Sequence, residues 1–409
     1  MQITALRARQ IFDSRGKPTI EADLVIDGNF LGRASVPSGA SKGRCEAMEK
    51  RDGGAAYCGN GVLGAVNLIN EEISPKLLLK SFTSQADLDE FLINLDGSLD
   101  KSRLGANTVL SVSIAYAKAV AKATNESLFA SIPYDCAKKL PVPMLNIING
   151  GIHADNRLSI QEFMIVPQRG EDIRQNLRIA TEVHYSLKKI LGSQGYRTNT
   201  GDEGGFAPDL SHAEEALEFI LQAIEKAGYK PGIDVCLALD CAGNELRHED
   251  GYTLSHTQKH LSTLELAHFY RGLCSRYPIV YIEDPFAEDD YEGWKYITQL
   301  LDKKVKIVGD DLFVTNSTKV MEGIKHKLAN AVLIKMNQIG TISETLRCIA
   351  LAQKHNIMHI ISHRSGETED TVISHLAVAT GSPYLKAGAL SGTDRVCKYN
   401  ELLRIRELL

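Results

Sequence analysis

The fold is decided by the stretch Ile279-Val280-Tyr281-Ile282-Glu283 (IVYIE). It is a short apolar run that ends in one charged residue, a pattern typical of a strand that is buried on both faces. Similar runs recur between residues 235 and 386. Each ends in a polar residue or is followed directly by one, and these residues are Asp240, Asp310, Lys335, His363 and Lys386.

The spacing of these runs predicts a closed barrel. From Glu283 onward their ends lie roughly 25 residues apart, the length of one strand, one helix and the connecting loops. Helical patterns fit between them: Ile342 to His355 is amphipathic, and Ser211 to Ala227 opens with the capping-box pattern Ser211-His212-Ala213-Glu214. Repeated strand–helix units over roughly 270 residues suit a (β/α)8 barrel better than an open sheet. Because the carboxyl ends of barrel strands meet at one mouth, we expect the polar residues to converge there.

The first part of the chain has a different pattern. Ile20 to Ile26 alternates in polarity before the turn Asp27-Gly28-Asn29, which predicts a hairpin, and Asn107 to Lys122 has the pattern of a long helix. A segment punctuated by prolines follows and suggests a boundary. We therefore expect a smaller α+β lid or capping domain over residues 1–132 and a catalytic barrel over residues 133–409.

Composition excludes several classes of protein. The 409 residues carry 46 Lys and Arg against 51 Asp and Glu, a net charge of −5, so a generally basic nucleic-acid binder is excluded. No apolar run approaches the ~20 residues of a membrane helix, and no signal peptide is visible. The eight cysteines form no CxxC pair, which favours free thiols in a reducing cytoplasm. The closest pair, Cys236 and Cys241, should point to opposite faces of a strand.

Three acids at successive strand ends predict a metal site. Asp240, Glu283 and Asp310 would converge, and because carboxylates repel one another, a hard divalent cation such as Mg²⁺ is their natural partner. The alternative is that each acid caps a helix or lies in a loop. Lys335 would share the rim, either as a base whose pKa is depressed by a nearby cation or as the partner of one acid in a salt bridge. The residues of this pattern leave both alternatives open.

Other polar segments would reach the same mouth. His363-Arg364-Ser365-Gly366 offers a guanidinium, a hydroxyl and a flexible backbone, which suit a phosphate or carboxylate. Gly201-Asp202-Glu203-Gly204-Gly205 places acids in a sharply bending backbone, and Gly150-Gly151-Ile152-His153 does the same for a histidine. Each of these turns alone is weak evidence, because most glycine-rich turns only reverse the chain.

Taken together, these segments resemble the enolase family along essentially the whole chain. The motifs that carry the resemblance are Phe12-Asp13-Ser14-Arg15-Gly16, Pro37-Ser38-Gly39-Ala40-Ser41, Leu104-Gly105-Ala106-Asn107, Met144-Leu145-Asn146-Ile147-Ile148-Asn149-Gly150-Gly151, Gln161-Glu162-Phe163-Met164, Gly201-Asp202-Glu203-Gly204-Gly205-Phe206-Ala207-Pro208, Gly309-Asp310-Asp311-Leu312, Lys335-Met336-Asn337-Gln338-Ile339-Gly340 and Ser362-His363-Arg364-Ser365-Gly366-Glu367-Thr368. The resemblance implies an atypical barrel whose second strand is antiparallel. It also implies the dehydration of 2-phosphoglycerate to phosphoenolpyruvate in glycolysis, and the reverse reaction.

The resemblance also implies roles for individual residues. The catalytic residues would be the base Lys335, the acid Glu203, Glu162 in its support, and His363. Two Mg²⁺ ions are expected, the first held by Asp240, Glu283 and Asp310 and the second by Ser41 on a closing lid. The substrate would be bound by His153, Gln161, Arg364, Ser365 and Lys386. As in most of the family, we expect a homodimer or a higher oligomer, a phosphorylated small-molecule substrate, and no membrane or direct nucleic-acid partner.

The chain departs from the family pattern at the lid and the last strand. Lys42 replaces a usual threonine, Ala387 a usual threonine, and Gly392-Thr393 a usual Arg-Ser pair. Lys42 would weaken the second metal by repulsion, add a contact to the substrate phosphate, or point to solvent and change little. These departures leave open the alternative that the chain is a lyase acting on an analogue of 2-phosphoglycerate, for instance one with a phosphonate or an extra carboxylate. A third alternative is an added non-catalytic binding role, with a surface or secreted fraction beside the cytoplasmic one, as in some enolases.

Overall fold

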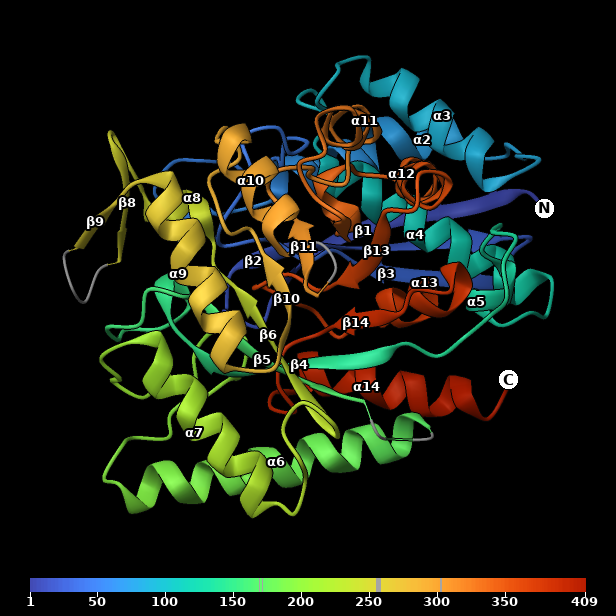
Figure 1. The fold of residues 1–409 in the computed structure, drawn as a ribbon. Helices are drawn as coiled ribbons and strands as arrows, with labels where there is room; N and C mark the ends of the chain where they lie inside the picture. The colour runs from blue at the N-terminus through green and yellow to red at the C-terminus, as the bar shows by residue number, and fades with distance from the viewer. Residues whose placement is uncertain (169, 171, 255–258, 302–303) are drawn as a thin grey trace.

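The computed structural model describes residues 1–168, 170, 172–254, 259–301 and 304–409 (Figure 1). The chain begins with an antiparallel three-stranded sheet of β1 (Ile3–Phe12), β2 (Pro18–Ile26) and β3 (Phe30–Ser35), in that order. The predicted hairpin joins β2 to β3. Its turn residues Asp27 and Gly28 have φ values of 51° and 75°, a conformation that Gly and Asp adopt more readily than most residues.

Short helices and one long helix follow this sheet in the chain. The elements are α1 (Leu63–Asn67), η2 (Leu68–Ile73), α2 (Ser74–Leu77), α3 (Gln85–Asp96), α4 (Ala106–Ala123) and α5 (Leu128–Ser131). Helix α4 is the long helix expected over 107–122, and it packs on β2 and β3. The contact is close at Gly32, where a Cβ atom would lie 1.9 Å from the carbonyl oxygen of Ala115, so only glycine fits.

The rest of the chain forms the predicted barrel. Eight strands close in the order β10-β11-β12-β13-β14-β4-β5-β6. Their bounds are β4 (Val142–Asn149), β5 (Glu162–Pro167), β6 (Val235–Asp240), β10 (Ile279–Glu283), β11 (Lys306–Gly309), β12 (Ala331–Ile334), β13 (Met358–Ser362) and β14 (Tyr384–Lys386). Strand β5 is antiparallel to both β4 and β6, and the other pairs are parallel. This confirms the atypical barrel that the resemblance implied.

Helices surround the barrel. They are α6 (Ile173–Ser193), α7 (Ala213–Lys226), α8 (Gly243–Leu246), α9 (Thr263–Arg276), α10 (Tyr291–Leu301), α11 (Ser317–His326), α12 (Ile342–Lys354), α13 (Val372–Thr380) and α14 (Thr393–Arg406). A small antiparallel sheet of β7 (Arg247–His248), β8 (Gly251–Leu254) and β9 (Lys259–Leu261) lies at one side of the molecule (Figure 1). Helices α6 and α7 lie side by side beneath β4 to β6. No helix in the described part of the chain is both long and apolar enough to cross a membrane.

The capping box predicted at Ser211 is wrong. Helix α7 begins at Ala213, and its N-cap is His212. The reason is that Glu215, and not Glu214, reaches back: its carboxylate accepts the backbone N–H of Ser211 at 2.8 Å and the hydroxyl of Tyr196 at 2.7 Å.

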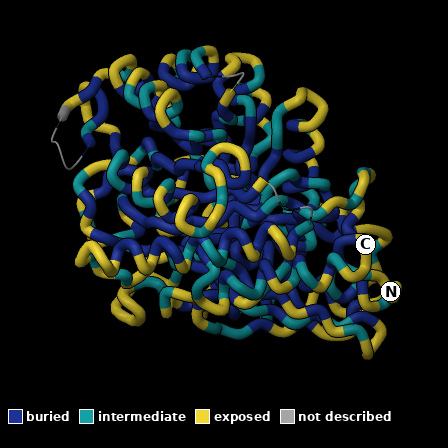
Figure 2. Tube along the Cα trace, turned by 60° about the horizontal axis from the view of Figure 1, so that its bottom comes forward, coloured by how far each residue is buried: buried dark blue, intermediate teal, exposed yellow. Residues whose placement is uncertain are grey.

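The core has two parts, and buried chain runs through the middle of the molecule (Figure 2). A small cluster of residues from facing barrel strands includes Met144, Met164, Tyr281 and Leu333. A larger cluster fills the space between strands and helices and continues into the N-terminal sheet. Cys236 belongs to the first cluster and Cys241 to the second, which confirms that the two thiols face apart.

Candidate active site

The carboxyl ends of the barrel strands carry the predicted residues. Asp240, Glu283 and Lys386 are the last residues of β6, β10 and β14. Asp310, Lys335 and His363 follow β11, β12 and β13 directly. One cavity at this mouth is lined by twelve of the thirteen predicted site residues: Ser41, His153, Gln161, Glu162, Glu203, Asp240, Asp310, Lys335, His363, Arg364, Ser365 and Lys386.

Glu283 is the predicted residue that does not line the cavity. Its carboxylate is fully buried, with the Nζ of Lys386 at 2.8 Å and the hydroxyl of Tyr281 at 2.5 Å. Burial and the neighbouring charge of Asp240 raise the pKa of Glu283 to about 8. The side chain therefore lies at the floor of the site, beneath Lys386.

Lys386 forms ion pairs with three acids of the barrel mouth. Its Nζ lies 3.0 Å from Asp240, 2.8 Å from Glu283 and 3.2 Å from Glu162, and all four side chains are buried. Burial alone would lower the pKa of Lys386, but these carboxylates raise it well above its usual value. The cluster holds more negative charge than one ammonium group can neutralise, which suits a divalent cation.

Lys335 forms an ion pair with Asp310, whose other oxygen accepts a hydrogen bond from Gln338 at 2.8 Å. Burial opposes the charge of Lys335, but Asp310 raises its pKa. The ion pair is the second of the two alternatives for Lys335, a salt bridge to one of the acids. The depressed pKa was expected beside a bound cation and stays a prediction.

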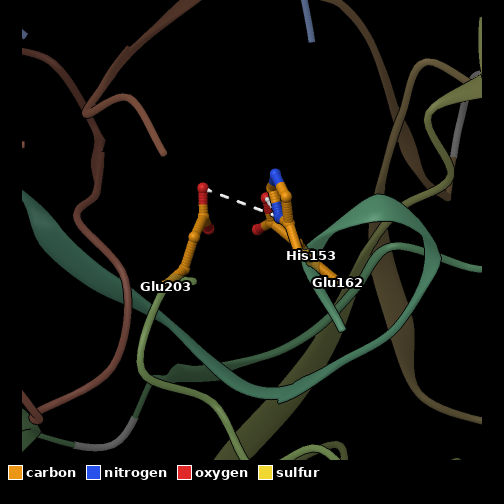
Figure 3. Close-up of side chains that lie close together, drawn as sticks. All are labelled: His153, Glu162 and Glu203. Carbon is orange, nitrogen blue, oxygen red and sulfur yellow. Dashed lines mark ion pairs between the residues drawn. The ribbon is translucent and has the colours of Figure 1, made fainter. Parts of the chain in front are cut away.

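Glu203 lies opposite His153 and Glu162, which overlap in the view of Figure 3. The Nδ1 of His153 lies 3.8 Å from Glu162 and 3.9 Å from Glu203, and the Nε2 of His363 lies 3.3 Å from Glu203. Burial and the charge of Glu203 raise the pKa of Glu162 well above its usual range. Burial opposes the charge of Glu203 as well, but the two histidines lower its pKa. Two carboxylates this close titrate as a pair and differ in proton affinity, which suits proton transfer.

A loop from the N-terminal sheet closes the mouth. Ser38 and Gly366 exchange backbone hydrogen bonds of 2.8 and 2.9 Å, so the lid is bound to the loop after β13. The N–H of Ala40 donates to the hydroxyl of Ser365 at 2.6 Å, and Arg364 donates to the carbonyl of Ser41 at 3.0 Å.

Three of the departures have clear surroundings. The ammonium of Lys42 lies 2.7 Å from Glu49, on the lid itself, and does not line the cavity. Ala387 is fully buried next to Lys386. Gly392 precedes helix α14 with a φ of 81°, a backbone conformation that disfavours the arginine usual in the family.

Several residues at the mouth were not predicted. Asp284 and Asp311 bring oxygens within 4.8 Å of one another and of Asp310. The carboxylate of Asp284 accepts the N–H groups of Asp310 and Asp311 at 2.9 Å each and so fixes the end of β11. Burial and the charge of Asp310 raise the pKa of Asp311 to about 7. Their signal was available, since each directly follows a predicted ligand in the sequence.

Glu46 is another unpredicted member. It lies on the lid, and its two oxygens each lie 3.1 Å from the guanidinium of Arg364. No local pattern in the sequence marks it, because its partner is more than three hundred positions away.

The fold and the site define a class of enzyme: a barrel that carries lysines and carboxylates at its mouth, closed by a loop from a separate N-terminal sheet. Two family models match the chain. The model described as "Enolase, N-terminal domain" matches residues 3–132, and the one described as "Enolase, C-terminal TIM barrel domain" matches residues 137–409. The chain therefore belongs to the enolase family, the phosphopyruvate hydratases, which are metal-dependent hydro-lyases of glycolysis.

Proposed function

We propose that this chain interconverts 2-phosphoglycerate and phosphoenolpyruvate with Lys335 as the base and Glu203 as the acid. The observation that carries the proposal is that one cavity is lined by all four of the side chains involved, Lys335, Glu203, Lys386 and Arg364. The proton on carbon 2 is weakly acidic, because its removal places negative charge beside a carboxylate. A site that stabilises this charge with cations is therefore required.

The residue types of the donor set suit Mg²⁺, because all are oxygen donors. Asp240, Glu283 and Asp310 would hold a first ion with oxygen ligands, and Ser41 would contribute to a second. Among the described residues Asp310 lies in one group with Asp284 and Asp311, so Asp240 and Glu283 would have to move closer to it to bind one ion together. Burial raises the pKa of Glu283, which indicates that the ionised carboxylates of the cluster would be stabilised by a further positive charge. Bound Mg²⁺ would act as a Lewis acid on the substrate carboxylate, and pairing a lysine base with Mg²⁺ is the known strategy of the enolase superfamily.

The side chains divide the reaction between them. Lys335 must release Asp310 before its neutral amine can take the proton from carbon 2. As the double bond forms between carbons 2 and 3, the bond from carbon 3 to its hydroxyl breaks, and Glu203 supplies the proton with which the hydroxyl leaves as water. Because the pKa of Glu203 is lowered and that of Glu162 is raised, this proton would first pass from Glu162 to Glu203. Glu162 stands beside Glu203 as the group that exchanges protons with it.

Other residues would hold the substrate during these steps. Arg364 and Ser365 suit the phosphate, which would replace the contacts that Glu46 and Ala40 make with them in this structure. His153, Gln161 and His363 line the same cavity and would surround the reacting carbons, and Lys386 would suit the substrate carboxylate.

An absorbance assay tests the proposal. With 2-phosphoglycerate and increasing Mg²⁺, we expect ultraviolet absorbance to rise as the enol double bond forms. Lys335→Ala should abolish the rise, and Lys354→Ala, an exposed lysine at the end of α12, should leave it unchanged. A purified wild-type protein that gives no rise with Mg²⁺ would contradict the proposal. Greater turnover of a phosphonate or extra-carboxylate analogue would show instead that the departures changed the substrate.

We also infer a homodimer in the cytoplasm. The dimer is the usual state of the family. In the described residues all eight cysteines are free, which suits a reducing compartment. Sedimentation of the purified protein would measure the oligomer directly.

A further inference from the structure

Arg395 is a buried arginine that joins the two loops of the catalytic mouth. It lies near the start of helix α14, and 1% of it is exposed. Its guanidinium donates to the carbonyl oxygens of Arg364 and Ser365 at 2.5 Å each, and to that of Asp202 at 3.2 Å. Asp394 lies 2.8 Å from its Nε and balances its charge. The arginine therefore binds the loop before Glu203 and the loop after His363 at the same time.

The same guanidinium also contacts the Nδ1 atom of His363. An arginine has five N–H donors and no acceptor, so the ring nitrogen that faces it must be the acceptor. A proton on Nδ1 would place two donors against each other in a buried site, which costs on the order of a lost hydrogen bond. His363 is then neutral and carries its proton on Nε2.

The other side of the ring faces Glu203. Its Nε2 lies 3.3 Å from the Glu203 carboxylate, the one acid within 4 Å of it among the residues that the structure describes. This Nε2 is buried and has no aligned hydrogen-bond partner in the structure, so a small rotation of the ring or of Glu203 would complete the hydrogen bond. Gly388 keeps the three side chains together, since a Cβ there would lie 3.0 Å from Arg395, 3.1 Å from His363 and 2.8 Å from the Glu203 carbonyl. Further out, Glu367 is the other charge that acts on His363, and burial lowers the pKa of His363 to about 4.

We propose that Arg395 is a positioning residue that fixes His363 in its Nε2–H tautomer and so directs this N–H at Glu203. A neutral N–H donor at this place would hold the Glu203 carboxylate and would not take up its proton. Glu203 would then be free to receive a proton and to deliver it to the departing hydroxyl. This part of the inference rests on the proposed role of Glu203, whereas the tautomer of His363 does not.

Nitrogen-15 NMR of histidine-labelled protein tests the tautomer without substrate. The signals of His363, assigned by their loss in His363→Gln, should show a protonated Nε2 and an unprotonated Nδ1 at neutral pH. Arg395→Lys keeps a donor and should preserve this pattern, whereas Arg395→Met should give a mixture of tautomers. A protonated Nδ1 in the wild type would overturn the proposal, even if neither variant folds.

Kinetics separate positioning from a merely structural role. Because Arg395 supports another side chain, we expect Arg395→Met to lower kcat roughly 10- to 100-fold, with a much smaller change in KM and recovery of most of kcat in Arg395→Lys. Arg271→Met, at an exposed arginine of α9, is the matched control and should match the wild type. An equal kcat in Arg395→Met and the wild type would overturn the proposal. If every variant folds but the wild type shows no turnover, the proposed function fails while the tautomer result still stands.

Discussion

Replacing Lys386 with methionine removes an ammonium group that touches three buried acids. Its Nζ lies within 3.2 Å of Asp240, Glu283 and Glu162, and 2% of its side chain is exposed. Breaking a buried ion pair by removing one partner costs about 3–5 kcal/mol, because a charge is left buried without compensation. We expect Lys386→Met to lose that much free energy of unfolding when Mg²⁺ is removed by EDTA.

The loss should depend on pH with a defined sign. An acid whose pKa is higher in the folded chain than in the unfolded chain lowers the free energy of unfolding as the pH rises. The loss begins above the pKa of the unfolded chain and is complete only above the pKa of the folded chain. Without Lys386, the pKa of Glu283, already raised to about 8, should rise further. Below pH 8 Glu283 keeps its proton in the folded wild type and in the folded variant alike, so its part of the destabilisation should appear only above pH 8. Asp240, whose pKa Lys386 lowers, should contribute from about pH 4 upward, so the destabilisation should already be present at neutral pH and should increase above pH 8.

Urea unfolding with and without Mg²⁺ measures both effects. A cation that binds only the folded chain adds about 2.7 kcal/mol at a hundred times its Kd, and the variant should gain at least as much from Mg²⁺ as the wild type. Lys354→Met, at an exposed site, is the control for the loss of a lysine. If Lys386→Met were as stable as the wild type in EDTA at pH 8, the carboxylates would not be clustered around this lysine, and the reasoning would be refuted.

Three further predictions concern the same mouth. Mg²⁺ should bind more weakly as the pH falls below 8, because Glu283, whose pKa is about 8, must lose a proton to become a ligand. Calorimetry in two buffers should detect the release of this proton on binding, and binding without proton release would contradict the prediction. Arg364→Met should raise KM about 30-fold or more, since a lost charge-assisted contact costs about 2 kcal/mol; an unchanged KM would exclude a phosphate contact. Lys42→Thr should change the Mg²⁺ dependence of activity less than about threefold, because Lys42 pairs with Glu49 on the surface of the lid; a larger change would place its charge at the second metal.

The barrel was predictable because its strands are buried on both faces. Such strands must be continuous apolar runs, so the residue at which Ile279–Glu283 turns polar marks the mouth of the barrel. The same argument located Asp240 and Asp310. The antiparallel β5 could not be derived in this way, because Glu162–Pro167 is as apolar as its parallel neighbours. It came from the family resemblance alone.

Contacts between segments that lie far apart in the sequence could not be predicted, because no short sequence pattern marks them. The partners Arg364 and Glu46, and Arg395 and His363, are brought together by the closing of the lid and the packing of α14. The failed capping box has a similar cause, since Tyr196 and the N–H of Ser211 fix Glu215, and neither is visible in a four-residue pattern. The roles of the site residues and the division at residues 132 and 133 remain predictions.

Exchange of the carbon-2 proton of 2-phosphoglycerate with deuterated water, followed by NMR, tests the central assignment most directly. A Glu203→Gln variant should still exchange this proton while failing to release water, because the base is intact and the acid is missing. A Lys335→Met variant should do neither. If the Lys335→Met variant exchanged the proton at the rate of the wild type, Lys335 would not be the base.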